Sequence, residues 1–329
     1  MPAAAALGDQ QAQLLVVADR TGCTPTALGH LPEREIGVLR AFGHGLATLT
    51  DVRTSVNHRV CGHLSGTLSR MPTTAANSEA PTPLITGVAV RVGKVIAQTL
   101  VSAGYRVWIH YNRSSSEAEE LCRSLGAKCL GTLAAQLADQ TAREALCARV
   151  QDPSGPAAGR LDLLVNSAAS FESGRFEART DADLRRVLEV NLVAPISFAR
   201  AFAPALRRTQ GAIVNILDLA AYHPWNNYLD HCTAKAGLWM ATRALASELA
   251  PNVRVNGISP GTVLWPDSPQ FAPGSQARAR IVDRIPLARI GAPEDVADTV
   301  LFLARSTFIT GQAIAIDGGR MVRSPQEYL

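Results

Sequence analysis

The sequence predicts an α/β fold in which one mostly parallel, doubly wound sheet is covered by helices. Two observations predict it. From Pro83 onward, short apolar runs alternate with longer segments whose apolar residues recur every three or four positions. A turn that contains Gly87 and Gly93 joins the first apolar run to the first longer segment, where such a sheet places its first strand-to-helix connection.

Seven short apolar runs are expected to form the strands of this sheet. They are residues 84–86, 106–110, 128–131, 161–165, 211–217, 253–258 and 312–316. Five other segments have the apolar spacing of amphipathic helices, namely residues 91–104, 115–126, 139–151, 181–208 and 231–250. The segment 262–285 is rich in proline, glycine and alanine, and we expect it to be a mobile loop.

Residues 1–82 differ from the rest of the chain. They contain no lysine, hold four of the seven histidines, and have short apolar runs interrupted by glycine, proline or threonine. Residues 71–83 have the composition of a flexible linker. We therefore interpret residues 1–82 as an N-terminal extension that is either poorly ordered or, in its first 70 residues, translated upstream of a start at Met71. Residues 83–329 are then a single domain.

The composition excludes several classes of function. Hydrophobic residues make up 47% and charged residues 18% of the chain, which is typical of a globular protein. The net charge of +4 gives no field that would attract nucleic acid, and no long apolar stretch lacks charges, so we expect no membrane span. The six cysteines show no CxxC spacing and the start has no secretory signal. We therefore expect reduced thiols, no metal site and a cytoplasmic protein that acts on a small molecule.

The turn after the first strand has the composition of a phosphate-binding turn. Gly87 permits a tight turn, Gly93 permits close helix packing, and the helix N-terminus offers free N–H groups to a pyrophosphate. About twenty residues further on, an NAD-dependent enzyme would carry an acid for the ribose 2′-hydroxyl. Arg113 and Ser114 stand there instead. Because a cation and a hydroxyl suit a 2′-phosphate, the sequence favours a Rossmann-type domain that binds NADP(H).

Further residues narrow the interpretation. Arg91 stands inside the glycine turn, residues 110–114 read His-Tyr-Asn-Arg-Ser, and Asp218 ends a strand. Lys235, one of only three lysines, lies in the next helical segment. In these features the chain, across about residues 83–325, resembles the short-chain dehydrogenase/reductase superfamily and, within it, the pteridine reductases. Most of the superfamily has glycine at the position of Arg91 and serine at that of Asp218.

The resemblance implies which residues form the sites. The cofactor NADP(H) would lie along Gly87, Arg91, Val92, Gly93, Tyr111, Asn112, Arg113, Ser114, Leu137, Asn166, Ala168, Lys235, Pro260 and Gly261. The substrate would contact Arg91, Ser170, Phe171, Asp218, Tyr228 and Trp265. The catalytic residues would be Asp218, His231, Lys235 and Asn191.

The resemblance also implies roles for some of these residues. Phe171 would stack on a pterin ring, Lys235 would bind the nicotinamide ribose, and Asn191 would support a water-mediated proton path. The reaction would be hydride transfer to a C=N bond of a pterin, dihydropterin or dihydrofolate. The family usually forms homotetramers, which would bury parts of residues 231–250 and 310–316.

One departure from the family falls on the proton donor. The superfamily places a tyrosine four residues before the lysine, but this chain has His231. Tyr228 lies three residues too early, which on a helix turns its side chain by about 300°. The spacing keeps His231 and Lys235 on one helix face, and an imidazolium can donate a proton. The chain also lacks an acid in residues 133–137 and has Ala169 where the subfamily has serine.

Three hypotheses for the function follow. The first is a reductase like the pteridine reductases, in which Asp218 and His231 supply or relay the proton. The second is an NADPH-dependent reductase of another imine or ketone in specialised metabolism. The third is a catalytically silent NADP(H)-binding protein, because loss of the tyrosine is also how an inactive relative would look. On the same view, Asp218 is a cap residue and Phe171 and Trp225 are ordinary core or rim residues.

Overall fold

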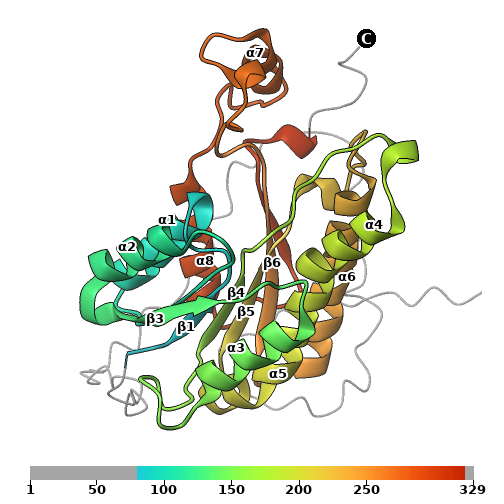
Figure 1. The fold of residues 1–329 in the computed structure, drawn as a ribbon. Helices are drawn as coiled ribbons and strands as arrows, with labels where there is room; N and C mark the ends of the chain where they lie inside the picture. Colours follow the sequence, from blue (N-terminus) through green and yellow to red (C-terminus); the bar gives the residue numbers. More distant parts are fainter. Residues whose placement is uncertain (1–79, 323–329) are drawn as a thin grey trace, which may run out of the picture. The chain divides into compact units, whose positions relative to one another are not determined.

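The computed structural model describes residues 80–322 of the chain (Figure 1). The predictions for residues 1–79, and the last seven residues of the predicted domain, lie outside these described residues. Within the described part, Thr82 already pairs with Asp162, whose carboxylate accepts a hydrogen bond from the Thr82 N–H at 2.8 Å. Among the described residues, the segment before β1 (Pro83–Ile85) is therefore already bonded to the domain.

A seven-stranded parallel sheet forms the centre of the described residues. Its strand order is β3-β2-β1-β4-β5-β6-β7, which is the doubly wound arrangement that the sequence predicts. All seven predicted strands are confirmed. They are β1 (Pro83–Ile85), β2 (Val107–Tyr111), β3 (Cys129–Ala134), β4 (Leu163–Asn166), β5 (Ala212–Ile216), β6 (Arg254–Pro260) and β7 (Ala313–Ile316).

Helices cover both faces of the sheet (Figure 1). The predicted helices are found as α1 (Arg91–Ser102), α2 (Ser115–Leu125), α3 (Gln140–Gln151), α4 (Asp181–Leu188), α5 (Ala194–Thr209) and α6 (Leu229–Leu249). The segment predicted as one helix over 181–208 is divided by a π-helical turn, η4 (Glu189–Val193), between α4 and α5. Such turns insert an extra residue into a helix and are frequent at functional sites.

Two apolar layers hold the sheet between the helices. On one face, Ile96 and Leu100 of α1 pack with side chains of the sheet, and on the other Phe198 and Phe202 of α5 do the same. All four side chains are buried, and burying each one contributes roughly 1.5–3 kcal/mol relative to leaving it exposed. The apolar residues that recur every three or four positions in the sequence therefore do form buried helix faces.

Two helices were not expected from the sequence. The first is α8 (Pro293–Arg305), which packs on α1 and begins with proline followed by two acids. Proline at the first helical position and acids in the first turn are a start signal, so this helix was predictable. The second is α7 (Gln276–Asp283), which follows the short turn η6 (Pro269–Phe271) inside the segment expected to be a mobile loop. Ser275 caps α7 by accepting a hydrogen bond from the N–H of Arg278.

The expectation that all cysteines are reduced thiols is wrong for one pair. Cys122 in α2 and Cys129 at the start of β3 form a disulfide, and their Cα atoms lie 5.3 Å apart. The chain reverses between them through Gly126, whose φ of +56° favours glycine. This reversal brings together two cysteines whose spacing matches no familiar motif. Among the described residues, Cys147 and Cys232 are free thiols.

Residues Asp181–Thr209 would be long and apolar enough to cross a membrane by length and composition alone. The segment belongs instead to the packed domain, because Phe198 and Phe202 are fully buried against the sheet. We interpret it as a core helix.

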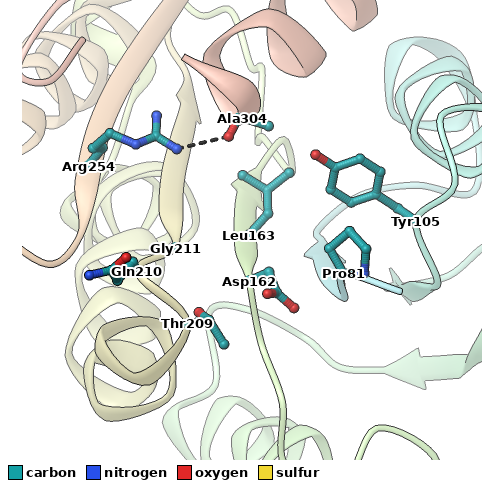
Figure 2. A pocket seen from close by; sticks show the side chains of 9 residues that line it. All are labelled: Pro81, Tyr105, Asp162, Leu163, Thr209, Gln210, Gly211, Arg254 and Ala304. Carbon is teal, nitrogen blue, oxygen red and sulfur yellow. Dashed lines mark hydrogen bonds between the residues drawn. The ribbon is translucent and has the colours of Figure 1, made fainter. Parts of the chain in front are cut away.

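A cavity of about 180 Å³ lies at the end of the sheet where the strands begin (Figure 2). Asp162, Gly211 and Arg254 line it, at the starts of β4, β5 and β6. The Arg254 guanidinium donates to the carbonyl oxygens of Leu303 and Ala304 at the end of α8. No predicted site residue lines this cavity. Ligands of doubly wound sheets bind at the opposite end of the sheet, outside the carboxyl ends of the strands.

Candidate active site

The predicted site residues gather where the strands end. The order of the sheet reverses between β1 and β4, so the segments that follow these two strands diverge there. Ligands of doubly wound sheets bind in the crevice at such a switch point. Thr86 joins the two segments, because its Oγ1 accepts hydrogen bonds from the N–H groups of Ser167 and Ala168, each at 3.0 Å.

The glycine turn has the close packing that the sequence predicts. Gly87 has a φ of +69°, and a Cβ atom there would lie 2.7 Å from the Cα of Ala168. A Cβ atom on Gly93 would lie 2.3 Å from the carbonyl oxygen of Gly87. Both positions therefore require glycine. The turn leads into the N-terminus of α1, whose free N–H groups fit a pyrophosphate.

His110 is hydrogen-bonded to this turn. Its Nδ1 accepts a hydrogen bond from the N–H of Gly87 at 3.0 Å, and its Nε2 lies 3.0 Å from the carbonyl oxygen of Ala135. Burial lowers the pKa of His110 to about 4, so the ring is neutral at physiological pH and Nε2 carries its proton. The sequence placed His110 in a motif but did not indicate this contact.

The cationic residues of the predicted cofactor site also lie at the end of the sheet where the strands end. Arg91 is exposed at the start of α1 and has a φ of +59°, a left-handed conformation that costs a non-glycine residue about 1–2 kcal/mol. Arg113 is exposed after β2, and Ser114 precedes α2. Strained residues concentrate at functional sites, and these side chains fit a phosphate-bearing cofactor.

Three further predicted cofactor residues, Asn166, Gly261 and Leu137, have different contacts from one another. The buried side chain of Asn166 donates to Asn215, while its own Oδ1 has no hydrogen-bond partner in the described part of the chain. Gly261 follows β6 and packs closely on Asp317. Leu137 has its side chain buried in the core, and its carbonyl oxygen accepts a hydrogen bond from Arg143. The side chain of Leu137 is therefore part of the core.

The remaining predicted cofactor residues lie beside the glycine turn or at the end of a strand. Tyr111 accepts a backbone hydrogen bond from Ala135, and Asn112 donates to Gln136 at 3.3 Å. Val92 is half-buried in the first turn of α1, and Pro260 is the last residue of β6.

Three predicted catalytic residues meet between β5 and α6. The imidazole of His231 is only 2% exposed, and its Nε2 lies 3.4 Å from Oδ2 of Asp218. Its Nδ1 lies 3.4 Å from the carbonyl oxygen of Ser170. One turn further along α6, the ammonium of Lys235 donates to the carbonyl oxygen of Ile216 at 2.7 Å. Both nitrogens of His231 thus face acceptors, an arrangement that an imidazolium satisfies as a double donor.

Asp218 has two partners. Its Oδ1 accepts a hydrogen bond from the N–H of Ala220 and so caps the short helical turn η5 (Leu219–Ala221). Its Oδ2 faces His231, and its side chain is 22% exposed. The cap interpretation and the catalytic interpretation of this residue are therefore compatible.

Asn191 lies in the π-helical turn η4 and is buried. Its side-chain amide grips the backbone of Ser170, because Oδ1 accepts from the Ser170 N–H at 3.1 Å and Nδ2 donates to the Ser170 carbonyl at 2.7 Å. The same carbonyl faces His231. Asn191 therefore fixes the loop that carries one acceptor of the His231 imidazole.

An aromatic cluster borders this imidazole. The ring of Phe171 stacks on Tyr228 with 4.7 Å between centroids and meets His231 edge-on at 4.8 Å. Trp225 also belongs to this cluster, with 6.3 Å between its ring centroid and that of Phe171. One interpretation of the sequence makes Trp225 an ordinary core or rim residue. Phe171 is 52% exposed, which leaves part of its ring available to a planar ligand.

Trp265 does not join this cluster. Among the described residues, its ring contacts are with Phe271, at 6.3 Å, and with the guanidinium of Arg278, at 4.8 Å. Both belong to the segment that carries α7. In this structure the predicted cover of the substrate site therefore packs on itself.

Comparisons with known proteins agree with this geometry. Residues 87–320 match the family described as Enoyl-(Acyl carrier protein) reductase. A relative from Streptomyces violaceoruber, whose name suggests a ketoacyl reductase of the granaticin polyketide synthase, is 34% identical over 253 residues, which cover 73% of this chain and 96% of the relative. Pteridine reductase 1 of Leishmania tarentolae is 32% identical over 281 residues, with the same two coverages of 73% and 96%.

A solved structure shares the fold. It comes from Agrobacterium tumefaciens and its name suggests a gluconate dehydrogenase. It is 27% identical, covers 74% of this chain and 97% of its own, and superposes with a TM-score of 0.68. The names of these three relatives differ in substrate but agree in chemistry, because all are oxidoreductases. By its parallel sheet, its glycine turn and these matches, the chain belongs to the short-chain dehydrogenase/reductase superfamily, whose members are oxidoreductases that use NAD(P)H.

Proposed function

We propose that this chain is an NADPH-dependent reductase in which His231 and Asp218 take the place of the superfamily's tyrosine and serine. The observation that carries the proposal is the buried imidazole of His231, whose Nε2 lies 3.4 Å from Oδ2 of Asp218 beside the exposed face of Phe171. An acid beside an aromatic ring suits a planar heterocycle with a C=N bond. The 32% identity to Pteridine reductase 1 of Leishmania tarentolae favours a pterin, dihydropterin or dihydrofolate as substrate.

The residues of the site divide the work of this reaction. When bound, NADPH would supply a hydride for the carbon of the C=N bond, and the nitrogen would then take a proton to become an amine N–H. His231 holds that proton at Nε2, next to Oδ2 of Asp218, whose side chain is more exposed than that of His231. The carboxylate stabilises the imidazolium, and the 3.4 Å separation is of the kind that tightens when a substrate binds.

The assay that tests this function follows NADPH oxidation by the full chain with a dihydropterin, dihydrofolate and a simple cyclic imine, at pH 5.5 and 7.5. Turnover of the pterins at either pH supports the proposal. A ketone reductase is the second candidate, because the relative from Streptomyces violaceoruber is 34% identical and its name suggests a ketoacyl reductase. Turnover of a β-keto thioester without turnover of the pterins would favour that candidate.

Arg113 is expected to set the preference for NADPH over NADH. Arg113→Ala removes a cation at the end of β2, where the sequence places the 2′-phosphate. Hydrogen bonds to charged groups contribute about 1.5–3 kcal/mol, so the Kd for NADPH should rise about ten- to hundredfold while the Kd for NADH stays the same. Fluorescence titration of both nucleotides checks this. Arg123→Ala, in the last turn of the following helix α2, is the control. Equal losses for both nucleotides would contradict a 2′-phosphate contact.

Lys235 is expected to make the reaction sensitive to alkaline pH. Burial lowers the pKa of Lys235 to about 8, against the opposing effect of Asp218. The ammonium is therefore charged below this pH and neutral above it, and kcat/KM, which reports groups of the free enzyme, should fall as pH rises through about 8. In Lys235→Met the residual activity should lack this decline. A wild-type profile that stays flat up to pH 9.5 would remove the charged lysine from the reaction.

We further propose that the chain forms a homotetramer, as the family resemblance implies. Met240 of α6 and Phe302 of α8 are exposed, and so is Phe308, which follows α8. β7 is an edge strand whose apolar residues are half-buried except for the exposed Ala315, and such edges favour pairing with a second chain. Light scattering should give four times the chain mass, and Phe302→Glu should reduce it. A monomer at micromolar concentration would contradict this proposal.

A further inference from the structure

The guanidinium of Arg179 lies between two carboxylates that belong to different parts of the site. Its Nε and Nη2 donate to Oδ2 of Asp230 at 2.8 and 2.6 Å. Its Nη1 donates to Oε2 of Glu172 at 3.3 Å. Arg179 thus joins the loop after β4 to the first turn of α6, two segments that are far apart in the sequence.

Each carboxylate neighbours a residue of the aromatic cluster. Asp230 is buried and directly precedes His231 in α6. Glu172 directly follows Phe171, and its Oε1 accepts a hydrogen bond from the hydroxyl of Ser170 at 2.8 Å. Because each acid is adjacent in sequence to a site residue, the guanidinium connects the segment that carries Phe171 with the segment that carries His231.

The loop end of this connection is fixed by a second arginine. Arg186 of α4 donates to both carboxylate oxygens of Glu172, from Nε at 3.2 Å and from Nη2 at 2.5 Å. Arg186 is the main reason that the pKa of Glu172 is lowered to about 2, so this acid stays charged at any pH at which the protein would work. Two parallel N–H···O bonds to one carboxylate also fix its orientation.

We propose that Arg179 is a positioning residue for the reaction, which holds Phe171 and His231 at the spacing that places a substrate ring against the acid. The proposal rests on the proposed function for its kinetic consequence, but its structural consequence can be measured without any turnover. A misplacement of about 1 Å by a residue outside the chemistry can lower a rate about a hundredfold. Arg179 touches neither the glycine turn nor Lys235, so cofactor binding should not depend on it.

The test compares Arg179→Ala with a matched control, Arg185→Ala, in the full chain. Arg185 also pairs with a carboxylate, that of Asp181, but the two side chains are 74% and 85% exposed. In Arg179→Ala, kcat should fall about ten- to hundredfold while the Kd for NADPH changes less than about twofold, and in Arg185→Ala both should be unchanged. Millimolar guanidinium chloride should restore part of kcat in Arg179→Ala, and the same concentration of sodium chloride should not.

Hydrogen exchange gives the readout that needs no substrate. The peptides that contain residues 169–176 and 229–232 should exchange faster in Arg179→Ala than in wild type, and at the wild-type rate in Arg185→Ala. A kcat within twofold of wild type, a parallel loss of NADPH affinity, or a loss that guanidinium does not relieve would overturn the proposal. If wild type reduces none of the substrates, the proposed function fails and exchange decides alone: unchanged exchange in Arg179→Ala would then overturn the role of Arg179.

Discussion

His231→Phe is expected to lower kcat by about 10²–10⁴-fold, which is the usual contribution of a positioned acid or base. Phenylalanine keeps the buried planar ring and its contact with Phe171 but removes both nitrogens that face Asp218 and Ser170. The Kd for NADPH should change less than about twofold, because the glycine turn is elsewhere. Steady-state kinetics and a fluorescence titration measure the two quantities on one preparation.

His223→Phe is the matched control for this substitution. His223 is exposed and lies eight residues before His231, outside the pairing with Asp218. Its replacement should leave kcat unchanged. If His231→Phe retains the wild-type kcat, the imidazole is not the acid, whatever its position.

His231→Tyr separates the active from the silent interpretation. Tyrosine restores the superfamily's usual donor four residues before Lys235. An active enzyme adapted to histidine should lose rate, because the phenol is larger than the imidazole and the site around residue 231 is closed. A chain that binds NADPH but reduces nothing, and that gains pterin reduction with this substitution, would instead be a silent relative.

Gly93→Ala is expected to have the largest effect on cofactor binding. The new methyl group would lie 2.3 Å from the carbonyl oxygen of Gly87 and 3.0 Å from the Cα of Val88. Both are backbone atoms, so the phosphate-binding turn itself must move. Overpacking of this kind costs about 1–3 kcal/mol, and we expect the Kd for NADPH to rise about ten- to hundredfold.

The control for this glycine is Gln98→Ala, because Gln98 is exposed on the same helix α1. Its replacement should change neither the Kd for NADPH nor the temperature of unfolding. If Gly93→Ala binds NADPH as tightly as wild type, the turn is not the cofactor site.

The sequence carries most of the fold and less of the site. Strands and helices were predictable because their apolar residues repeat with the period of each element, and α8 was missed although Pro293 marks its start. The pairing of Cys122 with Cys129 was not predictable, because it depends on how the chain reverses at Gly126. Spacing alone placed His231 and Lys235 on one face of a helix, since both belong to the same element.

Contacts between different elements could likewise not be predicted from the sequence. The hydrogen bond from Gly87 to His110 joins residues that are 23 positions apart, and the ion pair of Arg179 with Asp230 joins residues that are 51 positions apart. No local pattern encodes such pairs, because charged and polar residues are common on any surface. Trp265 shows the converse: the sequence placed it in the right segment, but its ring packs on Phe271.

The π-helical turn at Glu189–Val193 gives the long helical segment one residue more than a regular α-helix of the same course would have. Each residue of an α-helix turns the chain by about 100°, so the faces of α4 and α5 are out of phase by that angle. Arg186, before the turn, reaches Glu172, while Asn191, within it, reaches Ser170. This phase offset is consistent with two side chains five residues apart contacting one short loop. Removing one residue from the turn would restore a regular helix and rotate Arg186 away from the loop while α5 stays packed on the sheet.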